Sequence, residues 1–348
     1  MDPVPIHHSR HLSLRSSKKP DPEAGRRILV TGAAGFIGSH LAEALIDLGH
    51  EVVGIDGFTK NYPRAYKERN VARLRREPRF TLVELDLRTD PLDAHLEGVD
   101  VVINEAAIAG LPQSWVDVAT YVDCNVTGLG RLIDASRRAD VRRFIQISTS
   151  SVYGTDACGD EQLPTRPASP YGISKLAAEH LVLAHVQAND LPASILRYFS
   201  IYGPRQRPDM AYHIFIERLR AGEPLHIFGD GRQSRANTYV ADCVEGTIAA
   251  IDGSEVGEIY NIGGGIPLEL LQAVKLIASG LQVEPTLLYE PARPGDQRNT
   301  FADTSKARET FGYRPVTEPA DGLQRQAEWH LEELRSATPS PSVQRAGT

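Results

Sequence analysis

The chain has 348 residues and a formal net charge of −7 at pH 7, from 45 acidic and 38 basic side chains. That length suits two domains or one large α/β unit, and the evenly mixed charges provide no basic face for nucleic acid. Three scattered cysteines without metal-ligand spacing predict free thiols in the cytoplasm and no metal site, and no apolar run approaches the ~20 residues of a membrane span.

The two ends of the chain differ from the rest. Residues 1–25 are polar, contain prolines and show no periodicity, and residues 335–348 are rich in Ser, Pro and Thr. Both segments predict disordered tails. The histidines and basic residues of the first tail could also suggest a metal or a polyanion, but a solvated tail is the simpler interpretation, and the apolar core of a secretory signal is missing.

The first ordered elements surround a glycine-rich turn. Three glycines spaced by three separate an apolar run from an amphipathic helical pattern: Gly32, Gly35 and Gly38. A second apolar run follows the helix and ends in Asp56. This strand–turn–helix–strand unit predicts a dinucleotide site, with the pyrophosphate at the helix N-terminus.

Asp56 also indicates which dinucleotide binds. A carboxylate at this strand end accepts hydrogen bonds from both ribose hydroxyls and repels a 2′-phosphate. Gly57 and Phe58 follow Asp56, so the adjacent positions hold no arginine that could bind a 2′-phosphate. Lys60 is the nearest cation in the sequence. The sequence therefore predicts NAD and not NADP.

Apolar strand patterns alternate with helical patterns through the next part of the chain. Strands are expected at 80–83, 99–103, 144–147 and 193–196, with long helices at about 120–139 and 171–189. After residue 204 the pattern becomes irregular, and one helix (240–251) and one strand (258–262) follow. The alternation predicts an α/β fold, a Rossmann-type doubly wound parallel sheet with a smaller, discontinuous C-terminal substrate domain.

These patterns set the expected domain boundaries. The NAD-binding Rossmann domain is expected at 26–200 plus about 238–263. The nucleotide-sugar-binding domain is expected at 201–237 and 264–334.

Catalytic side chains are expected where the sheet ends. A hydroxyl cluster, 148–151, directly follows one strand, and Tyr171 and Lys175 stand four apart at the start of the next helix, on one face. An ammonium beside a phenol lowers the pKa of the phenol towards the range of a working base. A hydroxyl from Thr149 would orient the alcohol on which that base acts.

Together these motifs carry a family resemblance. TGAAGFIG, the Asp56 strand end, Asp86-Leu87, the NEAA segment at 104–107, STSSVYG and YGISK occur in the order and spacing of the extended short-chain dehydrogenase/reductase family. The similarity runs from about residue 27 to 329 and is greatest to the nucleotide-sugar epimerases, dehydratases and decarboxylases.

The resemblance implies roles for individual residues. Thr149, Tyr171 and Lys175 would form the catalytic triad. The implied NAD contacts are Gly32, Gly35, Phe36, Ile37, Gly38, Asp56, Asp86, Leu87, Asn104, Ala106, Ala107, Asn125, Ser148, Tyr171 and Lys175. Asn104-Glu105 departs mildly from the family's pattern, which commonly has His or Asn before the alanine pair.

The resemblance also implies a UDP-sugar substrate. Arg235 and Arg293 match two diphosphate-binding arginines, and Asp296 matches a uridine ribose contact. The full set of implied substrate contacts is Thr149, Ser150, Ser200, Arg207, Arg235, Arg293 and Asp296. Two positions depart from the common pattern, because Ala236-Asn237 replaces an Asp–aromatic pair and Ser200 stands where many relatives have asparagine.

The reaction depends on a few neighbouring residues. Ser150-Ser151 replaces the Asp-Glu pair of the 4,6-dehydratases, and decarboxylases usually have glutamate at the position of Ser151. The loop 205–211 resembles that of UDP-glucuronate 4-epimerases, in which Arg207 would meet the C6 carboxylate. The sequence thus predicts an NAD-dependent UDP-hexuronate (UDP-glucuronate) 4-epimerase working through a 4-keto intermediate.

Other reactions stay open. A 4-keto hexuronate is a β-keto acid that loses CO₂ readily, so the alternative is a UDP-glucuronate decarboxylase giving UDP-xylose or UDP-4-keto-xylose. A UDP-glucose 4-epimerase and a non-catalytic NAD-binding regulator rank lower.

A homodimer is expected from the two long helices. They carry more apolar positions than one sheet-facing stripe needs: Leu129, Leu132, Ile133, Leu176, Leu181, Val182 and Val186. The helices of two subunits would pair into a four-helix bundle, as the relatives do.

Overall fold

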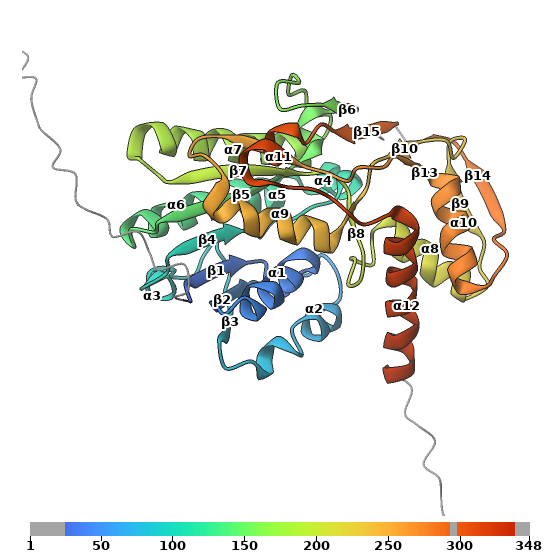
Figure 1. The fold of residues 1–348 in the computed structure, drawn as a ribbon, viewed down its shortest axis with the longest axis horizontal. Coiled ribbons are helices and arrows are strands. Elements are labelled where there is room, and N and C mark those ends of the chain that lie inside the picture. Colours follow the sequence, from blue (N-terminus) through green and yellow to red (C-terminus); the bar gives the residue numbers. More distant parts are fainter. Residues whose placement is uncertain (1–24, 293–297, 338–348) are drawn as a thin grey trace, which may run out of the picture.

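A seven-stranded parallel sheet forms the centre of the molecule (Figure 1). The computed structural model describes residues 25–292 and 298–337, so residues 1–24 of the expected first tail and residues 338–348 of the second lie outside the described part. The strands, in spatial order, are β3 (Phe80–Glu84), β2 (Glu51–Asp56), β1 (Arg27–Thr31), β4 (Val101–Asn104), β5 (Arg143–Thr149), β7 (Ala193–Tyr198) and β12 (Ile259–Ile262). The strand order reverses between β1 and β4, which confirms the expected doubly wound Rossmann fold.

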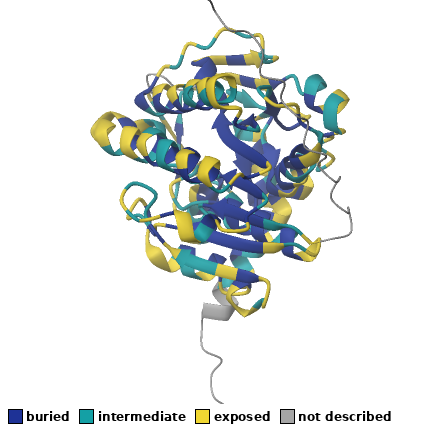
Figure 2. Cartoon of the chain, turned by 90° about the vertical axis from the view of Figure 1, so that its left-hand side faces the viewer, coloured by how far each residue is buried: buried dark blue, intermediate teal, exposed yellow. Residues whose placement is uncertain are grey.

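Helices cover both faces of this sheet. On one face lie α1 (Phe36–Asp47) and α9 (Val240–Gly253); on the other lie α3 (Asp93–Leu96), α6 (Gly128–Arg138) and α7 (Pro170–Asn189). Alternate residues of β1 belong to different layers of the core, with Ile28 and Val30 on the α1 side and Leu29 on the α6 side. The inner strands are therefore mostly apolar and buried on both faces, whereas the edge strand β3 is partly exposed (Figure 2).

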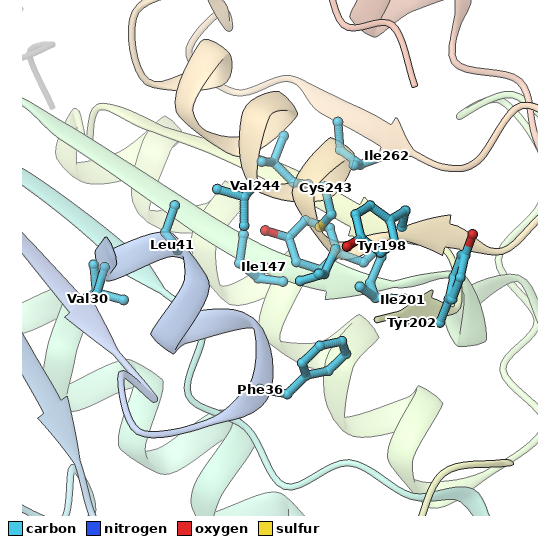
Figure 3. Packing of buried hydrophobic residues seen from close by; sticks show 14 of the residues in the cluster. Val30, Phe36, Leu41, Ile147, Tyr198, Ile201, Tyr202, Cys243, Val244 and Ile262 are labelled. Carbon is cyan, nitrogen blue, oxygen red and sulfur yellow. The ribbon is translucent and has the colours of Figure 1, made fainter. Parts of the chain in front are cut away.

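The core under α1 and α9 reaches the carboxyl ends of the strands. Figure 3 shows Ile147 of β5, Tyr198 of β7 and Cys243 of α9 packed together there. This apolar layer forms the floor beneath the ends of β5 and β7.

The helix expected at 120–139 is assembled from three pieces. Helix α5 (Val118–Val122) begins after Asp117, whose carboxylate accepts a hydrogen bond from the Thr120 amide at 3.1 Å. A π-helical turn, 123–127, joins it to α6. The helix expected at 171–189 is α7, which Ser169 caps through the Gly172 amide (3.1 Å) and in which Pro170 takes the first position.

The smaller domain is built from short elements. They include β8 (Ile201–Tyr202), α8 (Ala211–Arg220), β9 (Leu225–Phe228), β10 (Ser234–Arg235), β11 (Thr238–Tyr239), β13 (Leu268–Glu269), α10 (Leu270–Leu281), β14 (Leu287–Glu290), β15 (Asn299–Ala302), α11 (Ser305–Phe311) and α12 (Pro319–Ala337). Because α9 and β12 return to the main sheet between them, this domain is discontinuous, as expected. Its four-stranded sheet also takes in β6 (Asp156–Gly159), from the chain before residue 200.

The remaining elements are short. They are α2 (Arg64–Asn70), α4 (Leu111–Val116) and the 3₁₀ turns at Leu74–Arg76 and Ser150–Tyr153. Within the described ranges, no helix is both long and apolar enough to cross a membrane.

Candidate active site

One cleft runs along the carboxyl ends of the central strands. It is lined from β1, β2, β4, β5 and β7, at the reversal of strand order where α/β sheets bind their ligands. Most of the expected site residues line it: Gly32, Gly35, Phe36, Ile37, Gly38, Asp56, Asp86, Leu87, Ala106, Ala107, Ser148, Thr149, Tyr171, Lys175, Ser200 and Arg207.

The glycine turn fits a closely approaching ligand. Gly32 has φ +68°, and a Cβ there would lie 3.1 Å from the backbone of Ala106. A Cβ on Gly38 would lie 2.2 Å from the Gly32 carbonyl oxygen. Only glycine fits at these two positions, because the turn packs closely against the start of α1 and the residues after β4. The turn leads into the N-terminus of α1, which is the kind of position where a phosphate binds.

Asp56 is buried and already holds three donors. Its carboxylate accepts hydrogen bonds from the amides of Ala34 (3.1 Å) and Phe58 (2.8 Å) and from the Lys67 ammonium (2.9 Å). Lys67, and not the nearer Lys60, is thus the cation beside the expected ribose site. This pairing joins α2 to the end of β2, eleven residues away, and the sequence analysis missed it.

Asp86 also carries a partner that the motif did not predict. The Arg88 guanidinium donates to both of its oxygens, at 3.0 Å (Nε to Oδ1) and 2.7 Å. This bonding holds the pKa of Asp86 below its usual range. Arg88 and Cys124 line the same end of the cleft.

Thr149, Tyr171 and Lys175 lie at the opposite end. Thr149 ends β5, and Tyr171 and Lys175 occupy the first turns of α7. Burial raises the pKa of Tyr171, and a hydrogen bond with Thr149 and the charge of Arg207 oppose that rise. The sequence argument expected the Lys175 ammonium to lower this pKa. In the structure the pKa is raised, and the groups that oppose the rise are Thr149 and Arg207.

Lys175 points into the floor of the cleft. Its ammonium donates to the carbonyl oxygen of Ile147 at 2.6 Å. Burial lowers the pKa of Lys175 to about 8, against the opposing charges of Glu105 and Glu179.

Ser148 is fixed by a buried ion pair. Its hydroxyl donates to Glu179, which also accepts two hydrogen bonds from Arg197, at 2.9 and 2.6 Å. Arg197 donates in addition to the Tyr153 hydroxyl (2.8 Å). This network sets the relative position of β5, α7 and β7 beneath the cleft.

Two expected cofactor residues, Asn104 and Asn125, are buried outside the lining of the cleft. Asn104 bonds to Thr31 (2.7 Å) and Gln146 (2.9 Å), and so ties neighbouring strands together. The Asn125 amide exchanges hydrogen bonds with both backbone groups of Ile108. Both side chains support the cleft wall from behind.

The expected substrate residues divide into three groups. Thr149, Ser200 and Arg207 line the cleft, and the Arg207 guanidinium makes two 2.9 Å hydrogen bonds to Asp209. Ser150 is buried in the turn after β5, and Arg235 lies in β10 of the smaller sheet, outside the cleft lining. Arg293 and Asp296 lie outside the described residues.

Glu105 was not predicted as a site residue, and the sequence pattern marked it only as a departure from the family motif. It lines the cleft directly after β4, and one carboxylate oxygen, Oε2, is buried with no hydrogen-bond partner in the part of the chain that is described. The sequence did contain a signal for this residue, since an acidic residue in an otherwise apolar segment is rarely buried without a partner or a function.

Comparisons with known proteins agree with this geometry. Residues 28–263 match the model of the NAD dependent epimerase/dehydratase family. The chain is 44% identical over 301 residues to a protein of Bacillus subtilis named uncharacterized UDP-glucose epimerase YtcB, covering 85% of this chain and 95% of the relative. It is 34% identical to the UDP-glucuronate 4-epimerase of Thermodesulfobacterium geofontis, covering 88% and 96%.

A solved structure is similar over nearly its whole length. The UDP-glucuronic acid 4-epimerase of Bacillus cereus, crystallised with UDP-glucuronic acid and NAD, is 40% identical with a TM-score of 0.85. The match covers 88% of this chain and 99% of that one.

Proposed function

Because this chain belongs to the NAD dependent epimerase/dehydratase family, we propose that it is an NAD-dependent UDP-hexuronate 4-epimerase. The observation that carries the proposal is the presence of Tyr171, Lys175 and Arg207 in one cleft with the glycine turn. Tyr171 would then act as the base with Lys175 beside it, and Arg207 would bind the C6 carboxylate of the same sugar. The 40% identity to the Bacillus cereus enzyme supports the same substrate.

The residues of the cleft fit NAD. The glycine turn would hold the pyrophosphate, and Asp56 with Lys67 would hold the adenosine ribose. Asp86 and Leu87 would border the adenine. Ala106, Ala107 and Ser148 would line the path to the nicotinamide, with Asn104 and Asn125 fixing that wall. NAD supplies the hydride acceptor and later the hydride donor.

Tyr171 would act as the base. It takes the proton from the C4 hydroxyl while hydride leaves C4, and Thr149 holds the same hydroxyl by a hydrogen bond. Lys175 keeps positive charge near the phenolate. For inversion, the 4-keto sugar must turn its other face to the hydride before Tyr171 returns the proton to the oxygen.

The substrate would extend from Tyr171 towards the smaller domain. Thr149, Ser150 and Ser200 would contact the sugar and pyrophosphate, and Arg207 would meet the C6 carboxylate. Arg235 and Arg293 would clamp the diphosphate, and Asp296 would accept from the uridine ribose. We assign residues 26–200 and 238–263 to NAD, and residues 201–237 and 264–334 to the nucleotide sugar.

Product analysis with UDP-glucuronate and UDP-glucose tests this function. The expected product has the mass of UDP-glucuronate and the inverted configuration at C4 by NMR. Loss of CO₂ would identify the decarboxylase instead. Turnover of UDP-glucose alone would remove the hexuronate assignment.

We also propose a homodimer formed through α4, α5 and α7. Large apolar side chains are exposed on these adjacent helices: Trp115 (67%), Val116 (87%), Val118, Val122 and Ile173 (56%). A patch of this kind usually marks an interface. Leu129, Leu132, Ile133 and Val182 instead pack against the sheet, which corrects part of the sequence argument.

We place the protein in the cytoplasm. Its three cysteines, Cys124, Cys158 and Cys243, are all free thiols, as a reducing compartment allows.

A further inference from the structure

Glu105 is an ionisable side chain in the cleft that the reaction above does not use. It follows the last residue of β4, and its backbone lies against Gly32, with 3.2 Å between the Glu105 carbonyl carbon and the position of a Cβ on that glycine. The glycine turn and the end of β4 therefore hold its backbone tightly. Its buried Oε2 has no hydrogen-bond partner within the described ranges.

The groups around this carboxyl come from three elements. Lys175 and Tyr171 of α7, Tyr198 of β7 and Cys243 of α9 all interact with it electrostatically. Tyr198 and Cys243 belong to the apolar floor seen in Figure 3. Lys175 is the one cation among these four groups.

Burial in this setting makes ionisation costly. It raises the pKa of Glu105 to about 8, although the charge of Lys175 opposes the rise. The Lys175 ammonium is bonded to the Ile147 carbonyl, so it supports Glu105 only through space. At pH 7 a carboxyl with that pKa is about nine-tenths protonated.

The chemistry brings a second cation to this place. This step rests on the proposed function: hydride leaves the carbon whose hydroxyl meets Tyr171, so the nicotinamide ring must lie beside Tyr171. Glu105 and Tyr171 both line the cleft and interact electrostatically with each other. The nicotinamide ring is positively charged in NAD⁺ and neutral in NADH.

We propose that Glu105 is the counter-ion of the oxidised nicotinamide ring. Its carboxyl is neutral in the empty cleft, releases its proton to solvent when NAD⁺ binds, and then lies as a carboxylate beside the cationic ring. An opposite charge within about 4–6 Å lowers the pKa of a carboxyl group by roughly 1–3 units. The cleft therefore favours NAD⁺ over NADH.

This preference has a consequence for the reaction. A carboxylate beside the ring favours the oxidised state, so it speeds the return of hydride to the 4-keto sugar. The β-keto acid then has less time to lose CO₂. Glu105 is a positioning residue in this sense, acting through charge and without bonding to the sugar.

Calorimetry of cofactor binding tests the proposal without turnover. NAD⁺ and NADH are titrated into wild type, Glu105→Gln and the control Glu97→Gln at pH 7, in buffers of different ionisation enthalpy. Glu97 is exposed directly after α3, far from the cleft. Its variant therefore measures the effect of removing one carboxyl group elsewhere on the protein. The buffer dependence of the heat gives the number of protons released.

For a shift of roughly 1–3 pKa units, wild type and Glu97→Gln should release about 0.4 to 0.9 of a proton with NAD⁺ and little with NADH. Glu105→Gln should release almost none, and its affinity for NAD⁺ should fall about 2-fold to 100-fold while its affinity for NADH is kept. Equal proton release in Glu105→Gln and wild type would overturn the proposal, as would an equal loss of affinity for both cofactors. If wild type binds neither cofactor, the proposed function itself is wrong, and the role of Glu105 is lost with it.

Discussion

Removal of the Arg207 guanidinium should distinguish a hexuronate from a neutral sugar. This side chain is paired with Asp209 through two hydrogen bonds of 2.9 Å. Substrate binding would bring a second carboxylate to the same guanidinium. Arg207→Ala would leave that carboxylate and Asp209 without their shared cation.

The size of the effect follows from this pairing. Truncation of one partner of a buried, hydrogen-bonded charge pair costs about 2–5 kcal/mol, much of it from the charge left unpaired. Arg207 is partly exposed, with 21% of its side chain accessible, so the lower part of the range applies. We expect a loss of about 2–4 kcal/mol in kcat/KM for UDP-glucuronate, or roughly 30-fold to 1,000-fold.

Two further variants make the test specific. Arg207→Ala/Asp209→Asn should recover part of the loss, because it removes the uncompensated negative charge. Arg205→Ala is the matched control: Arg205 lies in the same loop but pairs with Glu43 at 2.9 Å, outside the cleft lining. It should affect UDP-glucuronate and UDP-glucose equally. Equal losses on both substrates with Arg207→Ala would refute the assignment of Arg207 to the sugar carboxylate.

Four other outcomes are expected. Tyr171→Phe should lower kcat by at least 10²–10⁴-fold in initial-rate assays while calorimetry still detects nucleotide-sugar binding, and a near-normal rate would exclude the proposed base. Glu179→Gln leaves Arg197 buried without its carboxylate and should cost about 3–5 kcal/mol in urea unfolding, which an unchanged midpoint would contradict. Ile173→Glu should give monomers in analytical ultracentrifugation, and a persistent dimer would place the interface elsewhere. Burial lowers the pKa of His213 to about 4 in the folded protein, so the unfolded protein binds more protons between pH 6.5 and 4. The free energy of unfolding should therefore fall as the pH is lowered through this range, and His213→Gln should reduce that fall in thermal melts.

The fold was predictable where its signals are local. The glycine turn, the apolar strands and the start of the helix expected at 171–189 each depend on a few adjacent residues, and all were placed correctly or within about two residues. Strands of two to four residues carry too little periodicity for such a prediction. The pairing of β6 with β15 joins residues about 140 positions apart, and no local pattern encodes it.

The candidate site divides in the same way. Tyr171 and Lys175 share a helix face by spacing alone, so their proximity follows from the sequence. The contact of Lys67 with Asp56, and the burial of Glu105 against the floor under β5 and β7, depend on how separate elements pack. A sequence pattern names such residues but does not say which charge faces which.

The proposed contact of Arg207 with the C6 carboxylate bears on the competition between epimerisation and loss of CO₂. Arg207 would stabilise that carboxylate as an anion, whereas CO₂ is neutral and its departure moves the charge towards the C4 oxygen and Tyr171. The proposed ion pair would thus be stronger before decarboxylation than in its transition state, which would raise that barrier. Glu105 would add to this effect by shortening the life of the keto acid. Arg207→Ala should therefore increase the share of decarboxylated product among turnovers, measured by mass spectrometry. A product ratio unchanged from wild type would mean that the geometry of the carboxylate, and not its charge pairing, protects the intermediate.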